Sequence, residues 1–384
     1  MRVAGRRDQI RQGSLDQCFY NERVNTRDVI IAGAGIIGVS IALELRERGA
    51  RVLVLDRGEP GQEASSAAAG MLAPFDPETP AGLRSLAVAS AQLYPAYVER
   101  LENLSQTQVD FRRRGTIALL EGSFLEGQAL PSEYRRLAPT EIQSLEPALQ
   151  AGERQAFFVQ DDSVDPALLM QAALLAASTA GIEVRGHSNV QAIRARSSSN
   201  DVEIVTNAGR FAAPAVVDCR GAWAGPPVKP RKGQLLYLQP QRGGLLEHVI
   251  NAFDVYMVPR SSGKILVGAT VEDVGFDKTV EAATIDRLRR AAAALVPELG
   301  SATVAAAWAG LRPGSPDDLP ILGPAEARGG FIATGHFRNG ILLAPVTAKI
   351  MANLALGQPA GWDISAFSPA RFAASHVNSL RNSD

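Results

Sequence analysis

The stretch Val29-Ile30-Ile31-Ala32-Gly33-Ala34-Gly35-Ile36-Ile37-Gly38 decides the fold. It joins a short apolar run to the spacing Gly-x-Gly-x-x-Gly, and a helix-like segment follows until Gly49. In this spacing Gly33 makes a tight turn, Gly35 lets backbone approach a pyrophosphate, and Gly38 lets the helix pack on the strand. The helix N-terminus offers unpaired N–H groups and a positive dipole end to the phosphates.

A second apolar run, Arg51-Val-Leu-Val-Leu-Asp56, follows the helix-like segment. Asp56 stands at the distance from the glycines where an acid takes a ribose hydroxyl. A lone Gly-x-Gly-x-x-Gly also arises in ordinary glycine-rich turns. The order strand, glycines, helix, strand and acid is far more specific, and it predicts a dinucleotide site.

Composition excludes several classes of protein. The chain has 384 residues, with 39 Lys and Arg mixed among 40 Asp and Glu. This balance gives no reason to expect nucleic acid or an anionic membrane as a partner. The two cysteines, Cys18 and Cys219, argue against a disulfide framework and a Cys/His metal site, and fit a reducing cytoplasm. No apolar run is long enough to cross a bilayer. We therefore expect a cytoplasmic protein with no metal.

Residues 1–27 differ from the rest of the chain. They are polar and contain Arg2, Arg6, Arg7 and Arg11, with no apolar segment of the kind found in a secretory signal. We expect a disordered N-terminal tail.

The segment Gly61 to Leu72 is rich in small residues. Such residues let backbone run close to a bulky flat ligand, and Ser65 and Ser66 can bond a phosphate or a ribose. The alternative is the start of an ordinary alanine-rich helix.

The remaining pattern predicts an α/β (α+β) protein. Helices are expected at Leu83–Leu101 and from Asp165 and Pro166 to Ala180, the latter with an apolar face of Leu168, Leu169, Ala172, Leu175 and Ala176. A further helix is expected at Ile285–Leu295, capped by Thr284 or the preceding turn. From Gly233 the chain is strand-rich, and α/β character returns at Phe331. We predict a Rossmann-like dinucleotide domain of residues 28–85, 160–225 and 326–384. An antiparallel, β-rich substrate domain of residues 86–159 and 226–325 is inserted into it.

Five motifs occur along the chain in an order typical of one protein family. The glycine stretch is followed by Ser66-Ala-Ala-Ala-Gly-Met-Leu72, Tyr256-Met-Val-Pro-Arg260, Trp308-Ala-Gly-Leu-Arg-Pro-Gly314 and Gly335-His-Phe-Arg-Asn-Gly-Ile-Leu-Leu-Ala-Pro345. Together they resemble the D-amino-acid oxidase family of flavoproteins. The resemblance covers nearly everything after the tail. Two departures are Cys219-Arg220, where small residues are usual, and a short link from Trp223 to Lys232.

The resemblance implies noncovalent FAD as the cofactor, molecular oxygen and a small amino acid as substrates, and a homotetramer. It implies cofactor contacts from Gly33, Gly35, Ile36, Ile37, Gly38, Asp56, Arg57, Ala64, Ser65, Ser66, Ala69, Gly70, Met71, Val190, Gly335, His336, Phe337, Arg338, Asn339, Gly340, Ile341 and Leu342.

The expected reaction moves a hydride from an amino-acid Cα to the flavin, which leaves the protein to orient the substrate. Arg312 can grip the substrate carboxylate bidentately; the alternative is a salt bridge to Asp317 or Asp318. Tyr256 can donate to the same carboxylate, or its ring can fill a core. Arg338 resembles the second residue lining the substrate pocket, or it is a surface arginine at a helix start.

His336 is expected to contact FAD rather than act as a general base, because hydride transfer from a neutral amine needs no side-chain base. The helix from Ile341, with Gly340, is expected to aim N–H groups at the flavin.

Three activities remain open from the sequence. The first is an oxidase that converts glycine, sarcosine or small D-amino acids to the 2-oxo acid, ammonia and hydrogen peroxide. The second is a related dehydrogenase or sarcosine oxidase-like flavoprotein. The third is a noncatalytic FAD-binding assembly subunit, against which Arg312 and Tyr256 argue, since a scaffold needs no carboxylate clamp.

Overall fold

The computed structural model describes residues 27–125, 130–196, 199–268 and 270–372. The predicted tail, residues 1–27, falls outside this part of the chain except for Arg27, as does Cys18. Arg27 donates a 2.6 Å hydrogen bond to Glu183.

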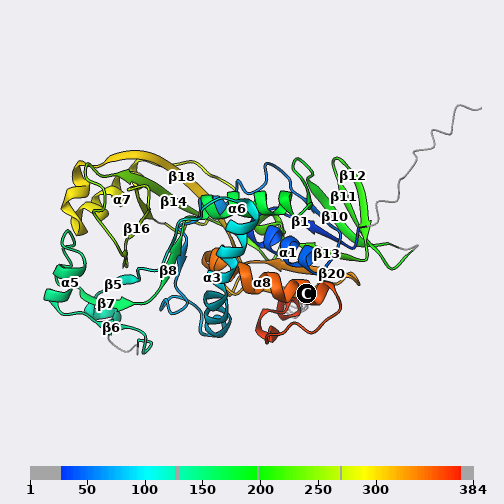
Figure 1. The fold of residues 1–384 in the computed structure, drawn as a ribbon, viewed down its shortest axis with the longest axis horizontal. Coiled ribbons are helices and arrows are strands. Elements are labelled where there is room, and N and C mark those ends of the chain that lie inside the picture. Colours follow the sequence, from blue (N-terminus) through cyan, green and yellow to red (C-terminus); the bar gives the residue numbers. More distant parts are fainter. Residues whose placement is uncertain (1–26, 126–129, 197–198, 269, 373–384) are drawn as a thin grey trace, which may run out of the picture.

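A six-stranded sheet forms the centre of the first domain (Figure 1). Its order is β19-β20-β13-β1-β2-β9, and only β19 runs antiparallel to its neighbour. Apolar runs explain the four-residue strands β1, β2 and β13, which are buried throughout, as expected for a parallel sheet covered on both faces. The bounds are β1 Val29–Ala32, β2 Val52–Leu55, β9 Glu183–Arg185, β13 Ala215–Asp218, β19 Ile321–Pro324 and β20 Gly330–Thr334.

Four helices pack around this sheet in one apolar core: α1 (Ile36–Glu47), α3 (Arg84–Ser105), α6 (Pro166–Thr179) and α8 (Gly340–Ala355). The predicted start of α6 is confirmed, because the Asp165 carboxylate accepts the N–H groups of Ala167 and Leu168 at 2.9 and 3.2 Å. Its predicted apolar face is partly wrong, since Leu175 is 41% exposed. The buried face instead consists of Pro166, Leu169, Met170, Ala172, Ala173, Ala176 and Ala177.

An eight-stranded sheet forms the second domain, with order β18-β14-β17-β16-β15-β5-β7-β6. All neighbours are antiparallel except β15 and β5. The strands are β5 Thr116–Leu120, β6 Arg135–Arg136, β7 Gln155–Val159, β14 Lys229–Gln239, β15 Val249–Ala252, β16 Tyr256–Pro259, β17 Ile265–Gly268 and β18 Thr303–Gly314. Helices α5 (Pro139–Leu145) and α7 (Ala282–Leu295) lie at this end (Figure 1). The predicted cap Thr284 lies inside α7, whose N-cap is Glu281.

Two small sheets complete the fold, with orders β10-β11-β12 and β3-β8-β4. Their strands are β3 Met71–Leu72, β4 Phe111–Arg112, β8 Asp162–Val164, β10 Val190–Ala195, β11 Val202–Thr206 and β12 Gly209–Ala213. The short helices are α2 Ala64–Ala67, α4 Gly122–Leu125, η1 Ala81–Leu83, η2 Gly221–Trp223, η3 Pro297–Ser301, η4 Phe337–Asn339, η5 Ser365–Phe367 and η6 Pro369–Phe372.

The packing of α3 bears on the predicted domain boundaries. Ser90 Oγ donates to the Leu342 carbonyl at 2.6 Å and Tyr94 Oη to the Ile341 carbonyl at 3.0 Å, so α3 is fixed to α8. A boundary at residue 86 would assign α3 to the substrate domain, whereas its contacts favour a boundary after Ser105. Similarly, β19 belongs to the six-stranded sheet, although residues up to 325 were predicted to belong elsewhere. The exact boundaries stay a prediction.

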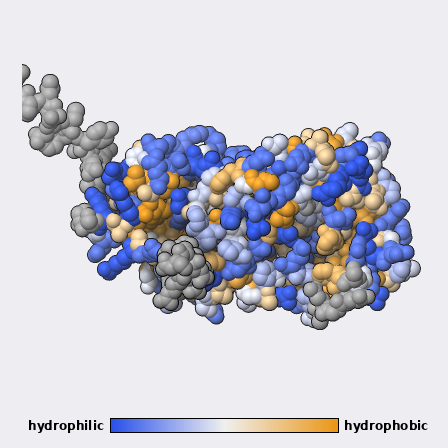
Figure 2. Space-filling model, turned by 180° about the vertical axis from the view of Figure 1, so that it is seen from behind, coloured by the Kyte–Doolittle hydropathy of each residue, from blue (hydrophilic) through white to orange (hydrophobic). Residues whose placement is uncertain are grey.

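The surface carries no single apolar face in the view from behind. Apolar residues form separate patches among hydrophilic ones (Figure 2). Within the described ranges, none of the helices combines the length and apolarity needed to span a bilayer.

Candidate cofactor and substrate site

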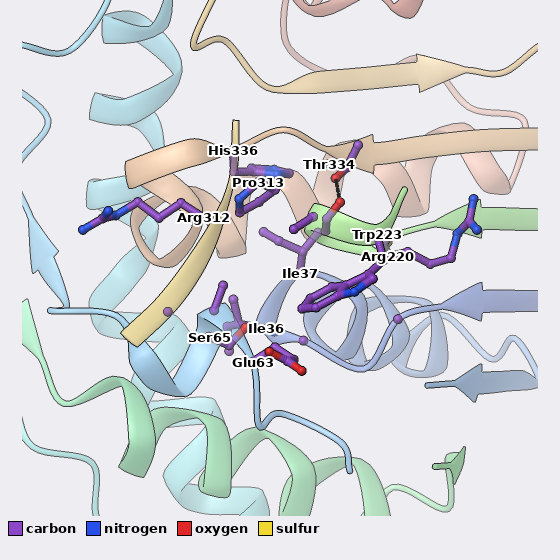
Figure 3. A pocket seen from close by; sticks show the side chains of 18 of the residues that line it. Ile36, Ile37, Glu63, Ser65, Arg220, Trp223, Arg312, Pro313, Thr334 and His336 are labelled. Carbon is purple, nitrogen blue, oxygen red and sulfur yellow. Dashed lines mark hydrogen bonds between the residues drawn. The ribbon is translucent and has the colours of Figure 1, made fainter. Parts of the chain in front are cut away.

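One elongated pocket lies at the carboxyl ends of β1, β2, β13 and β20, where a Rossmann-like sheet binds its ligand. It encloses about 1280 Å³ of empty space, part of it open to solvent. It continues past α2 to β14 and β18 of the eight-stranded sheet, so both domains contribute to its wall (Figure 3).

The β1–α1 turn is as tight as the glycine spacing predicts. Gly33 has φ +110°, and a Cβ there would lie 2.3 Å from the carbonyl oxygen of Cys219. A Cβ on Gly38 would lie 1.9 Å from the carbonyl oxygen of Gly33. Side chains at either position would therefore separate α1 from the strands. The N–H of Ile36, at the start of α1, donates to Ser65 Oγ at 2.9 Å, so α2 is fixed against this turn.

Asp56, after β2, fixes the same turn from the other side. Its carboxylate accepts the N–H of Ala34 at 2.7 Å and the N–H of Gly58 at 2.9 Å. Burial raises the pKa of this carboxyl above its ordinary value, although the two N–H groups oppose the shift. Asp56 lines the pocket, and its contact with a ribose stays a prediction.

A second helix N-terminus meets the pocket at its other end. Gly340 and Ile341 begin α8 and line the wall, directly after η4. His336 precedes them, is 2% exposed, and places Nε2 3.2 Å from Thr347 Oγ1. Burial lowers the pKa of His336 to about 3. The imidazole is therefore neutral at physiological pH, which makes it a poor anchor for a carboxylate and suits a packing role beside the cofactor.

Arg312 lies near the end of β18 on the side of the pocket formed by the eight-stranded sheet. Its Nη1 donates to the Thr270 carbonyl at 2.9 Å, and its guanidinium covers Gly233, where a Cβ would lie 2.2 Å from Nη1. Burial lowers the pKa of Arg312, opposed by the neighbouring Tyr256 hydroxyl. Burial raises the pKa of Tyr256, opposed by Arg312. The structure thus brings these two predicted carboxylate ligands together.

The salt-bridge alternative for Arg312 is not what the structure contains. Asp317 pairs with Arg371 at 2.8 Å. Among the described residues, Arg312 forms no ion pair with Asp317 or Asp318.

Arg338 combines both of its predicted roles. It lines the pocket, yet its side chain is 43% exposed and pairs with Glu78. Its guanidinium carbon also lies 5.4 Å from the ring centre of Phe337. Its positive charge opposes the rise in the pKa of Tyr256 and contributes to the lowering in Arg312, which places it near both.

The predicted residues divide into two groups. The pocket wall includes Gly33, Gly35, Ile36, Ile37, Asp56, Arg57, Ala64, Ser65, Val190, Arg312, His336, Phe337, Arg338, Gly340 and Ile341. The wall does not include Gly38, Ser66, Ala69, Gly70, Met71, Tyr256, Gly335, Asn339 or Leu342.

Several residues outside the wall have structural roles instead. Ser66 Oγ donates to the Gly61 carbonyl at 2.6 Å, so its hydroxyl is used inside the chain. The Ala69 carbonyl accepts from Arg260 at 2.6 Å. Gly70 has φ +80°, and a Cβ there would lie 2.0 Å from the Val164 carbonyl oxygen. Their cofactor contacts stay a prediction, while the lack of room for a Cβ explains the glycine at position 70 without any ligand.

Sequence reasoning missed one wall of the pocket. Cys219, Arg220, Gly221, Ala222 and Trp223 line it after β13, and Thr334 Oγ1 fixes this turn by donating to the Gly221 carbonyl at 3.0 Å (Figure 3). The signal was present, because a buried strand followed by small residues is the same pattern as at β1. Other unpredicted wall residues are Leu55, Glu63, Ala67, Ala68, Asn189, Gly233, Leu235, Gly310, Pro313, Ala333 and Thr334.

The residues present fit a flavin dinucleotide. The pocket is long, a close backbone approach is available at Gly33 and Gly35, and helix N-termini reach the wall at two separate places. Each N-terminus favours negative charge, one suited to a pyrophosphate and the other to a ring that gains electrons. No group of three or more histidine, cysteine, aspartate or glutamate side chains in the described part of the chain could hold a metal ion.

Comparison with known proteins identifies the class. Residues 28–354 match the model of the family described as FAD dependent oxidoreductase, DAO, and the chain belongs to this family. Its cofactor is therefore FAD, and the predicted family and fold class are confirmed.

The chain is similar to glycine oxidases and to a bifunctional ThiO/ThiG protein within this family. The chain is 35% identical over 368 residues to a glycine oxidase of Geobacillus kaustophilus, covering 90% of this chain and 97% of the relative. The crystal structure of glycine oxidase from that organism matches with a TM-score of 0.83, covering 89% and 98% of the two chains. The chain is also 35% identical over 364 residues to the bifunctional protein ThiO/ThiG of Trichormus variabilis, covering 90% of this chain. It spans about half of that relative, 55% of its length.

The neutral state of His336 predicts a pH dependence of stability. Its pKa of about 3 in the folded protein lies below the ordinary 6.5, so between these values the unfolded state binds more protons. His336 then makes the free energy of unfolding rise with pH, by up to about 1.4 kcal/mol per unit in this window. We expect His336→Gln to flatten urea-unfolding stability measured between pH 4.5 and 6.5.

The control is His187→Asn, which removes an exposed histidine and reports general effects of losing an imidazole. Parallel pH profiles for the parent protein and His336→Gln would contradict a buried neutral His336.

Proposed function

We propose that this protein is an FAD-dependent oxidase of glycine and related small amino acids or amines. Sarcosine and small D-amino acids are included, and the products are the 2-oxo acid, ammonia and hydrogen peroxide. We propose that it serves the thiazole branch of thiamine biosynthesis, acts in the cytoplasm and forms a homotetramer. Full-length likeness to a glycine oxidase supports the activity, and the bifunctional ThiO/ThiG relative supports the pathway.

The observation that carries the proposal is Arg312 on the wall of the cofactor pocket, with the Tyr256 hydroxyl beside it just outside the wall. Arg312 is only partly exposed, and a guanidinium withdrawn from water without an acidic partner is costly to maintain in a folded protein. Arg312 donates to the Thr270 carbonyl and lies beside the Tyr256 hydroxyl, and among the described residues it forms no ion pair with an acid. A substrate carboxylate would place a negative charge directly against Arg312 by accepting both N–H and O–H donors.

The protein's own contribution is positioning. Bound FAD supplies the acceptor for the hydride that leaves the substrate Cα. Arg312 and Tyr256 would hold the carboxylate, and this fixes the Cα relative to the wall formed by His336 and α8. Because His336 is neutral and hydrogen-bonded to Thr347, it would not compete with Arg312 for the substrate anion. The N-terminus of α8 would stabilise negative charge developing beside it.

Arg338 and Glu78 would set access to this position. Their ion pair joins the loop before α3 to η4, and it is accessible to solvent at both ends. Exposed ion pairs contribute little to stability, so this one can open without a large cost. Once freed from Glu78, Arg338 would offer a second positive charge to an incoming carboxylate.

Anaerobic mixing of the holoenzyme with glycine, sarcosine or D-alanine tests the proposed function. We expect glycine to bleach the visible absorbance of the flavin, and admission of air to restore it quickly with release of hydrogen peroxide. Bleaching without recovery in air would establish a dehydrogenase in place of an oxidase. An unchanged spectrum with all three amines would contradict catalysis and favour the noncatalytic subunit.

Arg312 variants test the assignment of the carboxylate site. Removing one partner of a hydrogen-bonded charge pair costs about 2–5 kcal/mol. Arg312→Met should therefore lower kcat/KM for glycine about 30- to 5000-fold. Arg312→Lys should retain part of the activity, since lysine keeps the charge and loses the planar fork. FAD content should stay at the wild-type level in both variants, which absorbance at 450 nm checks.

Arg371→Met is the matched control, because Arg371 pairs with Asp317 away from the pocket wall. Arg371→Met should lower the melting temperature and leave glycine turnover close to the wild-type value. An FAD-loaded, stable Arg312→Met enzyme with undiminished glycine turnover would overturn the carboxylate assignment.

A further inference from the structure

A surface segment beside the pocket has no part in the proposed chemistry. Residues 271–280 connect β17 to α7 without helix or strand apart from one bridge at Glu272, and we call them the strap. All of its residues except Glu272 are exposed. Four of the exposed ones are large and apolar: Val271, Val274, Phe276 and Val280. An irregular, apolar and exposed segment needs specific contacts to stay in one place.

The tip of the strap is fixed by an aromatic stack. The Phe276 ring lies 5.5 Å from the Trp223 ring, centre to centre, with 29° between their planes. The Arg57 guanidinium lies over the same indole at 4.1 Å. Trp223 and Arg57 both line the cofactor pocket, and the Trp223 side chain extends into the pocket region in Figure 3. Phe276 therefore supports a wall of the pocket from outside.

An ion pair makes a second connection to the same wall. Lys278 Nζ lies 3.0 Å from Glu63 Oε2. Glu63 lines the pocket and lies 3.4 Å from Arg57 as well. The strap, which belongs to the eight-stranded-sheet domain, thus contacts the dinucleotide domain on both sides of Arg57. An exposed pair of this kind fixes orientation more than it stabilises.

The base of the strap is anchored by a buried charge. Lys232 on β14 is fully buried, and its Nζ lies 3.2 Å from Glu272, 3.9 Å from Asp277 and 3.8 Å from Glu281. The backbones of Lys232 and Glu272 also exchange two hydrogen bonds of 2.9 Å. A buried ammonium requires its counter-charges. If Glu272 and Asp277 moved away from β14, Lys232 would become exposed to solvent or stay buried without a negative partner.

We propose that the strap retains FAD in its pocket. Its base is fixed to β14, and its tip holds the wall of Arg57, Glu63 and Trp223 closed across the boundary between the two domains. Release of the cofactor then requires that the Phe276–Trp223 stack separate first. This inference rests on the family's cofactor, and it does not depend on which amino acid is oxidised.

The rate of FAD release from the holoprotein tests the strap. The holoprotein is diluted into FAD-free buffer without any amino acid, and the rise in flavin fluorescence is followed. An aromatic pair contributes about 0.5–1.5 kcal/mol beyond its area, so Phe276→Ala should release FAD about 2- to 13-fold faster. Phe276→Trp, which keeps a ring at the stack, should release it at close to the wild-type rate. Lys278→Ala should change the rate less than about 2-fold.

Phe253→Ala is the matched control, because Phe253 is 83% exposed on the same domain and lies outside the strap and the pocket wall. Its release rate should equal that of the wild type. If Phe276→Ala releases FAD no faster than wild type, or Phe253→Ala releases it equally fast, the strap does not retain the cofactor. Should Phe276→Ala fail to fold, Phe276→Leu serves in its place, with faster release supporting the proposal and an unchanged rate refuting it.

Discussion

The close approach of backbone at the β1–α1 turn is the constraint on which the rest of the structure depends. Gly33 and Gly38 allow the carbonyls of Cys219 and Gly33 to come nearer than any Cβ would permit. Asp56 and Ser65 then fix the turn through the N–H groups of Ala34 and Ile36. Residues that follow β2 and β13, together with α2, all contact this one turn after β1. The pocket begins there, with Gly33 and Gly35 in its wall.

The pocket extends from the β1–α1 turn to β14 and β18 of the second domain, and the proposed chemistry needs groups from both ends. The nucleotide end is built from glycine, backbone N–H groups and one partly buried acid, Asp56. The far end contains a neutral histidine and a partly buried arginine beside a tyrosine. Neutral and cationic groups at this end suit an anionic substrate next to a ring that gains electrons. The two domains must therefore hold a fixed relation, and the strap contacts both of them.

Local patterns predicted much of this arrangement. The glycine spacing located the β1–α1 turn, and the capping pattern of Asp165 and Pro166 located the start of α6, because both depend on neighbours in sequence. The resemblance supplied Arg312, Tyr256 and His336, which the sequence alone could not have distinguished from core or surface residues. The Trp223 wall and the strap escaped prediction, since Phe276 meets Trp223 and Lys278 meets Glu63 only after two domains have packed. The exposure of Leu175 on α6 was missed because helical spacing shows which residues share a face of the helix. It does not show which face packs against the core.

The central claim is that one pocket holds FAD along the β1–α1 turn and presents a carboxylate to Arg312. A crystal structure of the FAD-loaded protein with acetate, an unreactive carboxylate, tests this most directly. The account predicts FAD density from Asp56 to His336, with the acetate oxygens within hydrogen-bonding distance of Arg312 and Tyr256. Acetate bound away from Arg312, or FAD bound away from Gly33 and Gly35, would contradict it.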